Sequence, residues 1–399
     1  MTTTRRAFLA GAATTRLTTG QGIRPDPDGM IVVNGKRTFL HGLYQLPNGT
    51  DRWQMAQDAG FQFTSTGANV ANLDLARKHG MYGWAGVGSI SPQKRTEDEE
   101  RIRKVVNEVK SHPALLFWET EDEPSYQWKK PGPRVPPAVI KDTYRFLKQL
   151  DPGHPVYLNH SPTNLVSTLQ EYNPGGDILG TDIYPVIPHG IRETYALWPD
   201  GRQGDFLNPY ISQVGPYADK LRQVAGRSRA IFMVLQAFAW EKLREKDQDP
   251  KLVLYPTQAQ LRFMACQSIV HGANGLLWWG LGYTPADAPF WSDLAAVTKD
   301  LRTLDRELAA APTKLPLRLE YHDTGHSLDR GIEWIAKPSG SGAMLIAVNA
   351  DSNPVDVTLR GLDRFGKVSA LFESRGLAVK HGALRDQYEP FGVHAYRLG

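Results

Sequence analysis

From residue 38 onward, short apolar runs alternate with longer amphipathic stretches along the chain. A short apolar run bounded by turn residues is typical of a buried strand, whereas apolar residues three and four positions apart indicate a helix. The runs that this pattern predicts to be strands are 37–45, 61–66, 81–87, 114–120, 155–160, 177–185, 230–238 and 274–280. Regular alternation of strand and helix predicts an α/β fold with a parallel sheet.

The number of these units favours a closed barrel over an open sheet. Eight strand and helix units within about 275 residues fit a (β/α)8 TIM barrel. A doubly wound sheet is the alternative, but no GxGxxG motif follows the first strand. Helices are predicted over 96–112, 255–273 and 291–311, the first of which has an acidic first turn and later basic residues that suit the helix dipole.

Two segments lie outside the predicted barrel units. Ahead of the first strand, GMIVVNGKRTFLHG predicts a β-hairpin that turns at Asn34-Gly35 and caps the barrel floor. Beyond Pro312 the apolar pattern changes to a period of two, with Gly, Ser and Pro turns between short runs. We therefore expect a catalytic barrel over 23–312 and an antiparallel β-sandwich over 313–399.

Composition narrows the functional classes without deciding among them. The 46 basic and 42 acidic residues give a net charge of +4 with no long basic stripe, which argues against nucleic-acid binding. The single cysteine, Cys266, excludes a disulfide framework. No run of about 18 apolar residues, the length needed to cross a bilayer, is found after the first 22 residues.

The first 22 residues favour export. Arg5 and Arg6 followed by Phe8 and Leu9 resemble a twin-arginine signal, although Arg16 interrupts the apolar stretch behind them. We expect a periplasmic or secreted protein on this basis. If 1–22 is instead a disordered start, the protein is cytoplasmic.

A cluster of carboxylates follows the fourth predicted strand. Glu119, Glu121, Asp122 and Glu123 fall within five positions of HPALLFWETEDEPSYQ. Like charges at close range raise one another's pKa, so stability alone would select against them there. Because the carboxyl ends of barrel strands form the active-site face, the cluster indicates catalysis.

Other polar and aromatic residues are predicted at the same ends of the strands. Carboxylates beside aromatic rings suit a sugar, because rings stack on its apolar faces while two carboxyl groups flank the scissile bond. We expect no metal triad, phosphate loop or cofactor, and of the adjacent Trp278 and Trp279 we expect Trp278 to be the sugar platform. The residues predicted to contact substrate are Tyr44, Gln45, Trp84, Glu121, His160, Tyr184, Gln236, Trp240 and Trp278.

The segment HPALLFWETEDEP resembles the strand-four signature of the large clan of retaining TIM-barrel glycoside hydrolases. In that pattern, H-P-[apolar]-W-E-x-x-N-E-P, Glu123 matches the acid/base, Pro124 the proline and Trp118 the tryptophan, while Asp122 replaces the asparagine. DILGTDIYP is similar to the sixth strand, with Tyr184 at the usual tyrosine. The resemblance covers about residues 30–285 and implies a glycosidase acting on an oligosaccharide or glycoside.

One departure from the pattern affects the mechanism. The clan's nucleophile is a Glu at the end of strand seven, where this chain has Gln236. Glu241, in a segment that reads as a solvated loop, could supply a carboxylate instead. Asp182 or Asp122 could activate water in an inverting enzyme, and we favour Asp182 paired with Glu123. Glu119 and Glu121 alternate with Thr120, so one face of the strand is expected to bring a Glu toward the barrel interior, where a Lys or Arg must balance it.

Two further functions stay open. A degenerate barrel could bind carbohydrate without cleaving it, as Gln236 suggests. A metal-dependent amidohydrolase would need an HxH pair on the first strand, where only His41 is found. Long inserts at 127–137 and 186–213, the second carrying Trp198, Phe206 and Tyr210, are expected to shape the cleft or dock a second subunit, and the oligomeric state stays open.

Overall fold

The computed structural model describes residues 22–126, 132–191, 210–322 and 328–399. The expected export signal, apart from its last residue, lies outside the described residues. So do Trp198 and Phe206 of the second long insert and the start of the first insert at 127–131.

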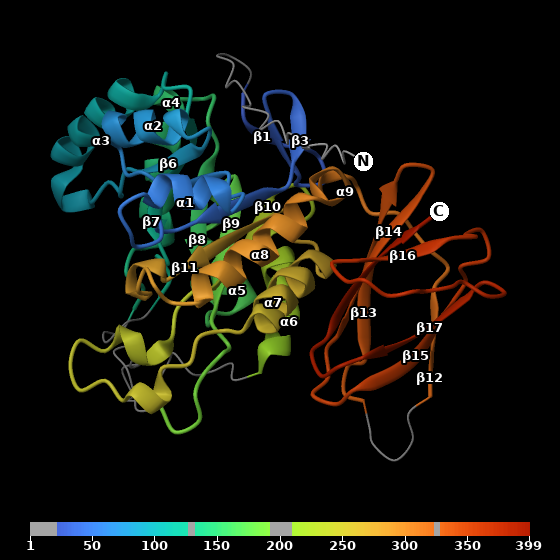
Figure 1. Ribbon diagram of the computed structural model, residues 1–399. Helices are drawn as coiled ribbons and strands as arrows, with labels where there is room; N and C mark the ends of the chain where they lie inside the picture. Colours follow the sequence, from blue (N-terminus) through green and yellow to red (C-terminus); the bar gives the residue numbers. More distant parts are fainter. Residues whose placement is uncertain (1–21, 127–131, 192–209, 323–327) are drawn as a thin grey trace, which may run out of the picture.

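The predicted barrel is confirmed: eight parallel strands close on themselves (Figure 1). Around the barrel the order is β10-β11-β4-β5-β6-β7-β8-β9, so the last two strands pair with the first and the sixth. The strands are β4 (Leu40–Leu43), β5 (Phe63–Ser65), β6 (Tyr82–Gly86), β7 (Leu115–Asp122), β8 (Val156–His160), β9 (Ile178–Ile183), β10 (Ala230–Gln236) and β11 (Gly275–Trp279).

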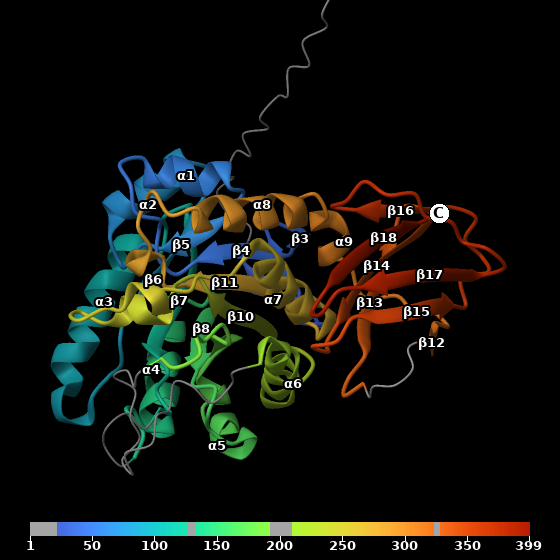
Figure 2. The ribbon, with the colours of Figure 1, turned by 60° about the horizontal axis from the view of Figure 1, so that its bottom comes forward.

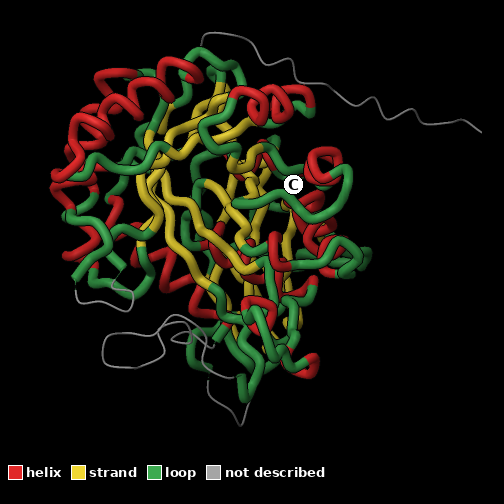
Figure 3. The backbone as a smooth tube through the Cα atoms, turned by 90° about the vertical axis from the view of Figure 1, so that its left-hand side faces the viewer, coloured by secondary structure: helices red, strands yellow, loops and turns green. Residues whose placement is uncertain are grey.

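One principal α-helix follows each barrel strand and packs on its outer side (Figure 3). They are α1 (Arg52–Asp58), α2 (Val70–Lys78), α3 (Arg95–Val109), α4 (Pro137–Leu150), α5 (Val166–Gln170), α6 (Val214–Ala225), α7 (Gln258–Val270) and α8 (Phe290–Arg302). The single helix expected over 291–311 is wrong, since α9 (Asp305–Ala309) is separate. The Thr303 hydroxyl donates to the Asp300 carbonyl, which competes with the helical ladder, and Leu304 leaves helical geometry.

The barrel interior is filled by large aromatic rings set against glycines. Phe63 packs with Trp84, Phe117 and Phe232 at centroid distances of 5.7, 5.6 and 6.1 Å. A Cβ on Gly42 would lie 2.3 Å from the Phe63 ring, which explains why this inward position on β4 carries no side chain. Gly180 and Gly275 leave the same kind of room for Tyr157 and Phe232. The interior is therefore a packed core below the mouth.

The predicted hairpin closes the amino-terminal end of the barrel. Strands β2 (Ile31–Val33) and β3 (Lys36–Thr38) follow the short β1 (Arg24–Pro25), and β2 pairs with both. Asn34 and Gly35 both have positive φ (51° and 79°), as a two-residue type I′ turn requires. Ile31 and Val33 join the same buried cluster as Leu40 and the interior rings.

The carboxy-terminal part consists of two antiparallel sheets packed face to face (Figure 2). One has the order β12-β15-β17 and the other β13-β14-β18-β16. Their strands are β12 (Arg318–Tyr321), β13 (Ile332–Ser339), β14 (Gly342–Asn349), β15 (Val355–Arg360), β16 (Val368–Leu371), β17 (Ala383–Tyr388) and β18 (Val393–Leu398). The predicted β-sandwich is thus present, and its first strand follows α9 after a short connection.

Strand β14 joins the sandwich to the barrel. Ala343, Leu345 and Ala347 face the sandwich core, while the alternate residues Met344 and Ile346 belong to the cluster that covers the outside of the barrel. Glu333 on β13 adds polar contacts: its Oε2 accepts from Gln267 Nε2 at 2.8 Å and lies 2.9 Å from His271 Nε2. The two parts therefore share buried apolar surface as well as ionic contacts.

Across the described ranges, no helix is long and apolar enough to cross a membrane.

The fit between Gly42 and Phe63 predicts that Gly42→Ala lowers the free energy of unfolding by about 1–3 kcal/mol, because the added methyl must displace a ring held on all sides. Urea unfolding measures the change. Gly282→Ala is the control, since a Cβ there meets nothing within 4 Å. Equal stabilities of the two variants would contradict the proposed packing.

Candidate active site

An irregularity in β7 decides which carboxylates face the barrel mouth. Glu119 pairs with Tyr157 on β8, but the next paired residue on β7 is Asp122, opposite Asn159. Three steps along β7 thus match two steps along β8, which is the signature of a β-bulge. The extra residue shifts the alternation, so Asp122 rather than Glu121 follows Glu119 on the inner side. Glu121 instead accepts a hydrogen bond from Ser89 Oγ at 2.7 Å.

The side-chain amide of Asn159 connects two of these carboxylates. Its Nδ2 donates to Asp122 Oδ1 at 2.9 Å and to Asp182 Oδ1 at 2.7 Å. Its Oδ1 accepts from the Tyr157 hydroxyl at 3.2 Å, which itself lies 3.0 Å from the Tyr44 hydroxyl. The tyrosine contact fixes the orientation of the amide, with both N–H bonds directed at carboxylates. The predicted residues Asp122, Asp182 and Tyr44 are therefore brought together.

Glu119 lies deeper than the pair. Its Oε2 accepts from the indole Nε1 of Trp84 at 3.1 Å, while its Oε1 is buried and has no hydrogen-bond partner among the described residues. Burial, followed by the charge of Asp122, raises the pKa of Glu119 to about 8. Glu119 is accordingly a neutral carboxylic acid at pH 7.

Asp182, at the end of β9, has the second strongly shifted carboxyl group. Burial and the charge of Asp122 raise its pKa to about 7, against the opposing effect of its two hydrogen bonds. The second bond comes from the Tyr184 hydroxyl, which donates to Asp182 Oδ2 at 2.7 Å. Both oxygens of Asp182 are thus held, and the group titrates close to neutral pH.

Glu123 follows the bulged strand in a left-handed backbone conformation. Its φ is +43°, an uncommon value for a residue with a side chain, and its N–H donates to the Asn159 carbonyl at 3.1 Å. Burial raises the pKa of Tyr184 most, followed by the charge of Asp182. The charge of Glu123 makes a smaller contribution in the same direction. The charge of Glu123 therefore acts on the hydroxyl that holds Asp182.

Aromatic rings form one wall beside these acids. Tyr184 stacks on Trp279 with a centroid distance of 5.4 Å and an interplanar angle of 22°. Trp279 also contacts Tyr283, whose side chain is 46% exposed. Trp240 is 3% exposed and donates from Nε1 to the Tyr184 carbonyl at 3.1 Å, so it holds this wall from behind.

Several residues expected to contact substrate lie elsewhere. Trp278 is 1% exposed and packs in the outer core, so alternation along β11 turns Trp279 inward instead. His160 likewise points outward against Tyr172, and burial lowers its pKa to about 3. Trp84 is fully buried and supports the site through its hydrogen bond to Glu119 and its ring contact with Tyr44. The Oε1 of Gln45 accepts from the Gly280 N–H at 3.0 Å and so supports the loop after β11.

Gln236 is a buried structural amide. It is 0% exposed, its Oε1 accepts from the Val186 N–H at 2.8 Å, and its Nε2 donates to the carbonyls of Val186 and Phe238, each at 3.0 Å. These bonds attach the segment after β9 to the end of β10. The alternative that Gln236 contacts substrate is therefore corrected, because its amide group is fully engaged by backbone.

Glu241 is also misread from the sequence as part of a solvated loop. It is 0% exposed, with Oε2 at 3.2 Å from Arg244 Nε and Oε1 accepting from the Asp249 N–H at 2.7 Å. These contacts hold the turn after β10 and make Glu241 a support of that loop. His41 is buried too, and its Nε2 lies 3.5 Å from Asp305 Oδ1, away from the mouth.

No family model matches the sequence, and no curated protein matches it. Solved structures share the fold. An α-amylase from Geobacillus thermoleovorans, solved with acarbose, has a TM-score of 0.56 and 9% identity over 91% of this chain and 98% of its own. An α-amylase from Anoxybacillus has a TM-score of 0.53 and 11% identity over the same shares.

A β-galactosidase from Marinomonas ef1 has a TM-score of 0.50 and 12% identity, and this chain, matched over 69% of its length, spans 62% of that enzyme. At such identities the similarity establishes a common fold, a TIM barrel that glycoside hydrolases also have.

Within the parts of the chain that the structure describes, no group of three or more His, Cys, Asp or Glu side chains is arranged to hold a metal ion.

Two central residues of the site, Asn159 and Tyr157, were not among the residues predicted to contact substrate. Both lie on β8, in the segment PVYLNH, where the inward positions are Tyr157 and Asn159. If the alternate residues Tyr157 and Asn159 had been assigned to the inner face of that strand, Asn159 would have been identified in place of His160. Trp279 could have been found in the same way, whereas the bulge in β7 leaves no sequence signal that we recognise.

The buried contacts of Gln236 predict that Gln236→Glu yields no functional nucleophile. The new carboxylate would face the carbonyl oxygens of Val186 and Phe238, so we expect a loss of roughly 1–3 kcal/mol of stability or more. Chemical denaturation and activity assays check both parts. An increase in turnover at unchanged stability would show that residue 236 reaches the substrate.

The raised pKa of Glu119 predicts a pH-dependent stability. Between its unfolded value of 4.5 and its folded value of about 8, the folded state binds more protons, so this contribution is complete below pH 4.5 and is lost as pH rises towards 8. Within this window, each step of one pH unit removes at most about 1.4 kcal/mol from the free energy of unfolding. Urea titrations from pH 5 to 8 should show a shallower fall for Glu119→Gln, and the exposed Glu97→Gln should keep the parent slope.

Proposed function

We propose that this protein hydrolyses, or transfers a glycosyl group at, a glycosidic bond in the barrel mouth. In this proposal Glu123 donates a proton to the departing sugar oxygen. Asp182 accepts a proton from the water that attacks the anomeric carbon, which gives inversion. The resemblance of WETEDEP to the clan signature and the fold shared with glycoside hydrolases support the reaction class.

The observation that carries the proposal is the position of Tyr184. Its hydroxyl donates to Asp182 at 2.7 Å, and the charge of Glu123 contributes to the raised pKa of the same hydroxyl. Asp182 accepts directly from this hydroxyl, and the charge of Glu123, which follows β7, also acts on it. In this proposal the two carboxyl groups approach one substrate from two sides.

The pKa of Asp182 suits a base. A general base is most effective when its pKa lies near the working pH, because it is then ionised and still a strong proton acceptor. Burial and the charge of Asp122 raise the Asp182 pKa to about 7, which meets that requirement. Tyr184 and Asn159 hold both oxygens and so fix the direction of proton transfer.

Asp122 fits a supporting role better than a catalytic one. Asn159 Nδ2 lies between Asp122 Oδ1 and Asp182 Oδ1, at 2.9 and 2.7 Å. The two oxygens cannot be further apart than the sum of those distances, so Asp122 and Asp182 act on each other at short range. Since the amide occupies the space between them, no sugar ring fits there. We assign Asp122 to hydroxyl binding and to the electrostatics of Asp182.

The aromatic wall supports a sugar as the substrate. Trp279, stacked on Tyr184 and in contact with the exposed Tyr283, presents ring surface beside the acids. We assign these residues to substrate binding.

A noncatalytic carbohydrate-binding protein is the second candidate. The buried, fully bonded Gln236 at the position of the clan's nucleophile favours it. If this alternative holds, sugars raise the melting temperature of the purified protein without being cleaved.

The test begins with purified protein and a panel of α- and β-glycosides, followed by NMR of the first anomer released. Inversion is expected. Glu123→Gln and Asp182→Asn should each lower kcat by about 10²–10⁴-fold, the usual contribution of a general acid or base. Glu108→Gln, an exposed site on α3, should leave kcat unchanged.

Retention of the anomeric configuration would show that Asp182 is not the base. Full activity of Asp182→Asn, together with loss of activity in Glu123→Gln, would show the same. Absence of turnover across the panel combined with stabilisation by sugars would favour the binding protein. If the protein shows no turnover and binds no sugar, both proposals are refuted.

A further inference from the structure

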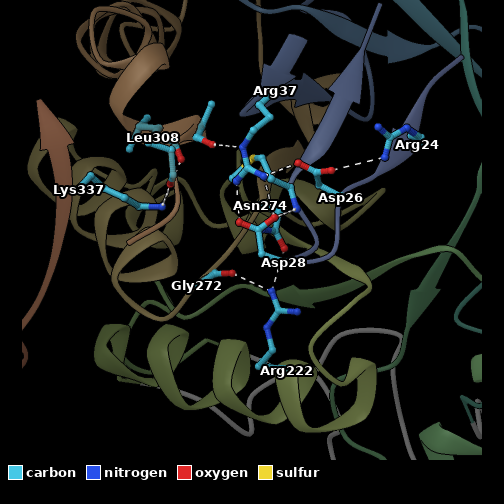
Figure 4. A network of polar contacts seen from close by, with 12 residues as sticks. Arg24, Asp26, Asp28, Arg37, Arg222, Gly272, Asn274, Leu308 and Lys337 are labelled. Atoms are coloured by element: carbon cyan, nitrogen blue, oxygen red, sulfur yellow. Dashed lines mark hydrogen bonds and ion pairs between the residues drawn. The ribbon is translucent and has the colours of Figure 1, made fainter. Parts of the chain in front are cut away.

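A cavity with charged side chains in a mainly apolar lining is found at the opposite end of the barrel from the mouth. It occupies about 350 Å³ where the amino-terminal strand ends meet the sandwich. Its lining includes Arg222 from the end of α6, Arg227 and Asn274 from the loops before β10 and β11, and Lys337 from β13. Asp28, ahead of β2, is the acidic side chain that faces it. Residues from both parts of the chain therefore build this space (Figure 4).

Three cations line this cavity without a carboxylate partner in the described part of the chain. Among the residues that the structure places, no Asp or Glu oxygen lies within 4.0 Å of a charged nitrogen of Arg222, Arg227 or Lys337. Lys337 is only 6% exposed, and burial lowers its pKa to about 8, so it is still mostly charged at pH 7. A buried ammonium without a counter-ion is costly, and such charges in proteins are normally paired.

Asp28 compensates this charge only in part, because it is engaged by Arg37. Arg37 donates to both of its oxygens, at 3.0 Å from Nη1 and 2.6 Å from Nη2, and the Met30 N–H lies 3.3 Å from Oδ1. The hydrogen bond from Arg37 lowers the pKa of Asp28 below its usual value. Figure 4 shows Arg37 and Asp28 engaged with each other on one side, with Lys337 and Arg222 approaching from two others.

Backbone carbonyl groups accept hydrogen bonds from some of these donors but do not neutralise the positive charges. Lys337 Nζ donates to the carbonyls of Ala310 (2.7 Å) and Leu308 (3.3 Å), at the end of α9. The terminal nitrogens of Arg222 bond carbonyls near the ends of α6 and α7. Helix carboxyl ends favour cations, so these contacts explain why the residues are tolerated. Carbonyls are dipoles, however, and the three cations outnumber the one acidic side chain in the described lining of the cavity.

Donors remain available towards the cavity. An ammonium has three hydrogens, of which two are used by Lys337. Asn274 Oδ1 accepts from the Ile231 N–H at 3.0 Å and from Arg222 at 2.8 Å, which orients its amide and leaves Nδ2 unused among the described contacts. Arg227 is exposed at the rim and carries five further donors.

We propose that this cavity binds a small oxyanion, a phosphate or carboxylate group carried by a molecule of about monosaccharide size. Lys337 and Asn274 donate to its oxygens from within, Arg227 closes on it from the rim, and Arg222 contributes charge. The bound anion compensates the buried cations and links the barrel floor to β13 of the sandwich. The site is separate from the barrel mouth and does not depend on the reaction proposed there.

The test uses the full-length protein with inorganic phosphate and with succinate, each compared with sodium chloride at equal ionic strength and pH 7. Thermal unfolding and isothermal titration calorimetry follow binding. We expect phosphate, succinate or both to raise the melting temperature above the chloride baseline with saturable heat. The stronger of the two identifies the oxyanion class. Equal melting curves in all three salts, with no saturable heat, would overturn the proposal.

Two variants assign the effect to this cavity. Lys337→Met and Arg227→Ala should each weaken the affinity for the anion by about tenfold, the effect of losing one charged contact. Because Lys337 also holds the Ala310 carbonyl, its variant can lose stability, whereas Arg227 is exposed and has no described partner. Arg145→Ala, an exposed arginine on α4, is the matched control and should keep parent affinity. Parent affinity in Arg227→Ala and Lys337→Met would place the anion elsewhere and refute the site.

Discussion

One extra residue in β7 determines the chemistry that the barrel mouth can offer. Without the bulge, strict alternation would direct Glu119 and Glu121 inward and turn Asp122 away. With it, Asp122 stands opposite Asn159, and a single amide can bridge to Asp182 on the next strand. The displaced strand end also brings Glu123 into a left-handed conformation beside the mouth. The arrangement of four acidic side chains thus depends on one local shift in register.

Charge crowding at this end is accommodated by protons and amides. Glu119 and Asp182 have pKa values of about 8 and 7 because they are poorly hydrated and share their surroundings with Asp122. A protonated acid can donate a hydrogen bond and costs little to bury, so the cluster does not need a lysine or arginine to balance it. The same property keeps groups able to exchange protons near neutral pH, which a site for glycosidic bond cleavage requires.

The two ends of the barrel carry opposite charge. Carboxylates gather where the strands end, beyond rings such as Phe63 and Trp84, while cations outnumber acidic side chains around the cavity at the amino-terminal floor. The packed aromatic interior separates the two regions, so neither neutralises the other. The sandwich contributes Lys337 to the second region and none of the residues identified in the first, which gives this part of the chain a role beyond covering the barrel.

The sequence alone was sufficient for the architecture, because hydrophobic periodicity reports which faces are buried. It predicted eight strands in their correct order, the hairpin at Asn34-Gly35 and the change to a sandwich, and it located the acidic segment on β7. Inward and outward positions were harder, since adjacent residues such as Trp278 and Trp279 differ only in parity. Deciding which of two adjacent residues faces inward requires the register of the neighbouring strands. A bulge changes that register, and no particular residue type in the sequence marks its position.

Tertiary structure decided which polar residues work together. Gln236 and Glu241 look functional in the sequence, but contacts with Val186 and Asp249, fifty and eight residues away, make them internal supports. Asn159 looks ordinary and becomes central because Asp122 and Asp182 converge on it from neighbouring strands. Local sequence determines secondary structure through propensity and burial, whereas the pKa values and pairings of a site arise from groups that only the closed barrel brings within hydrogen-bond distance.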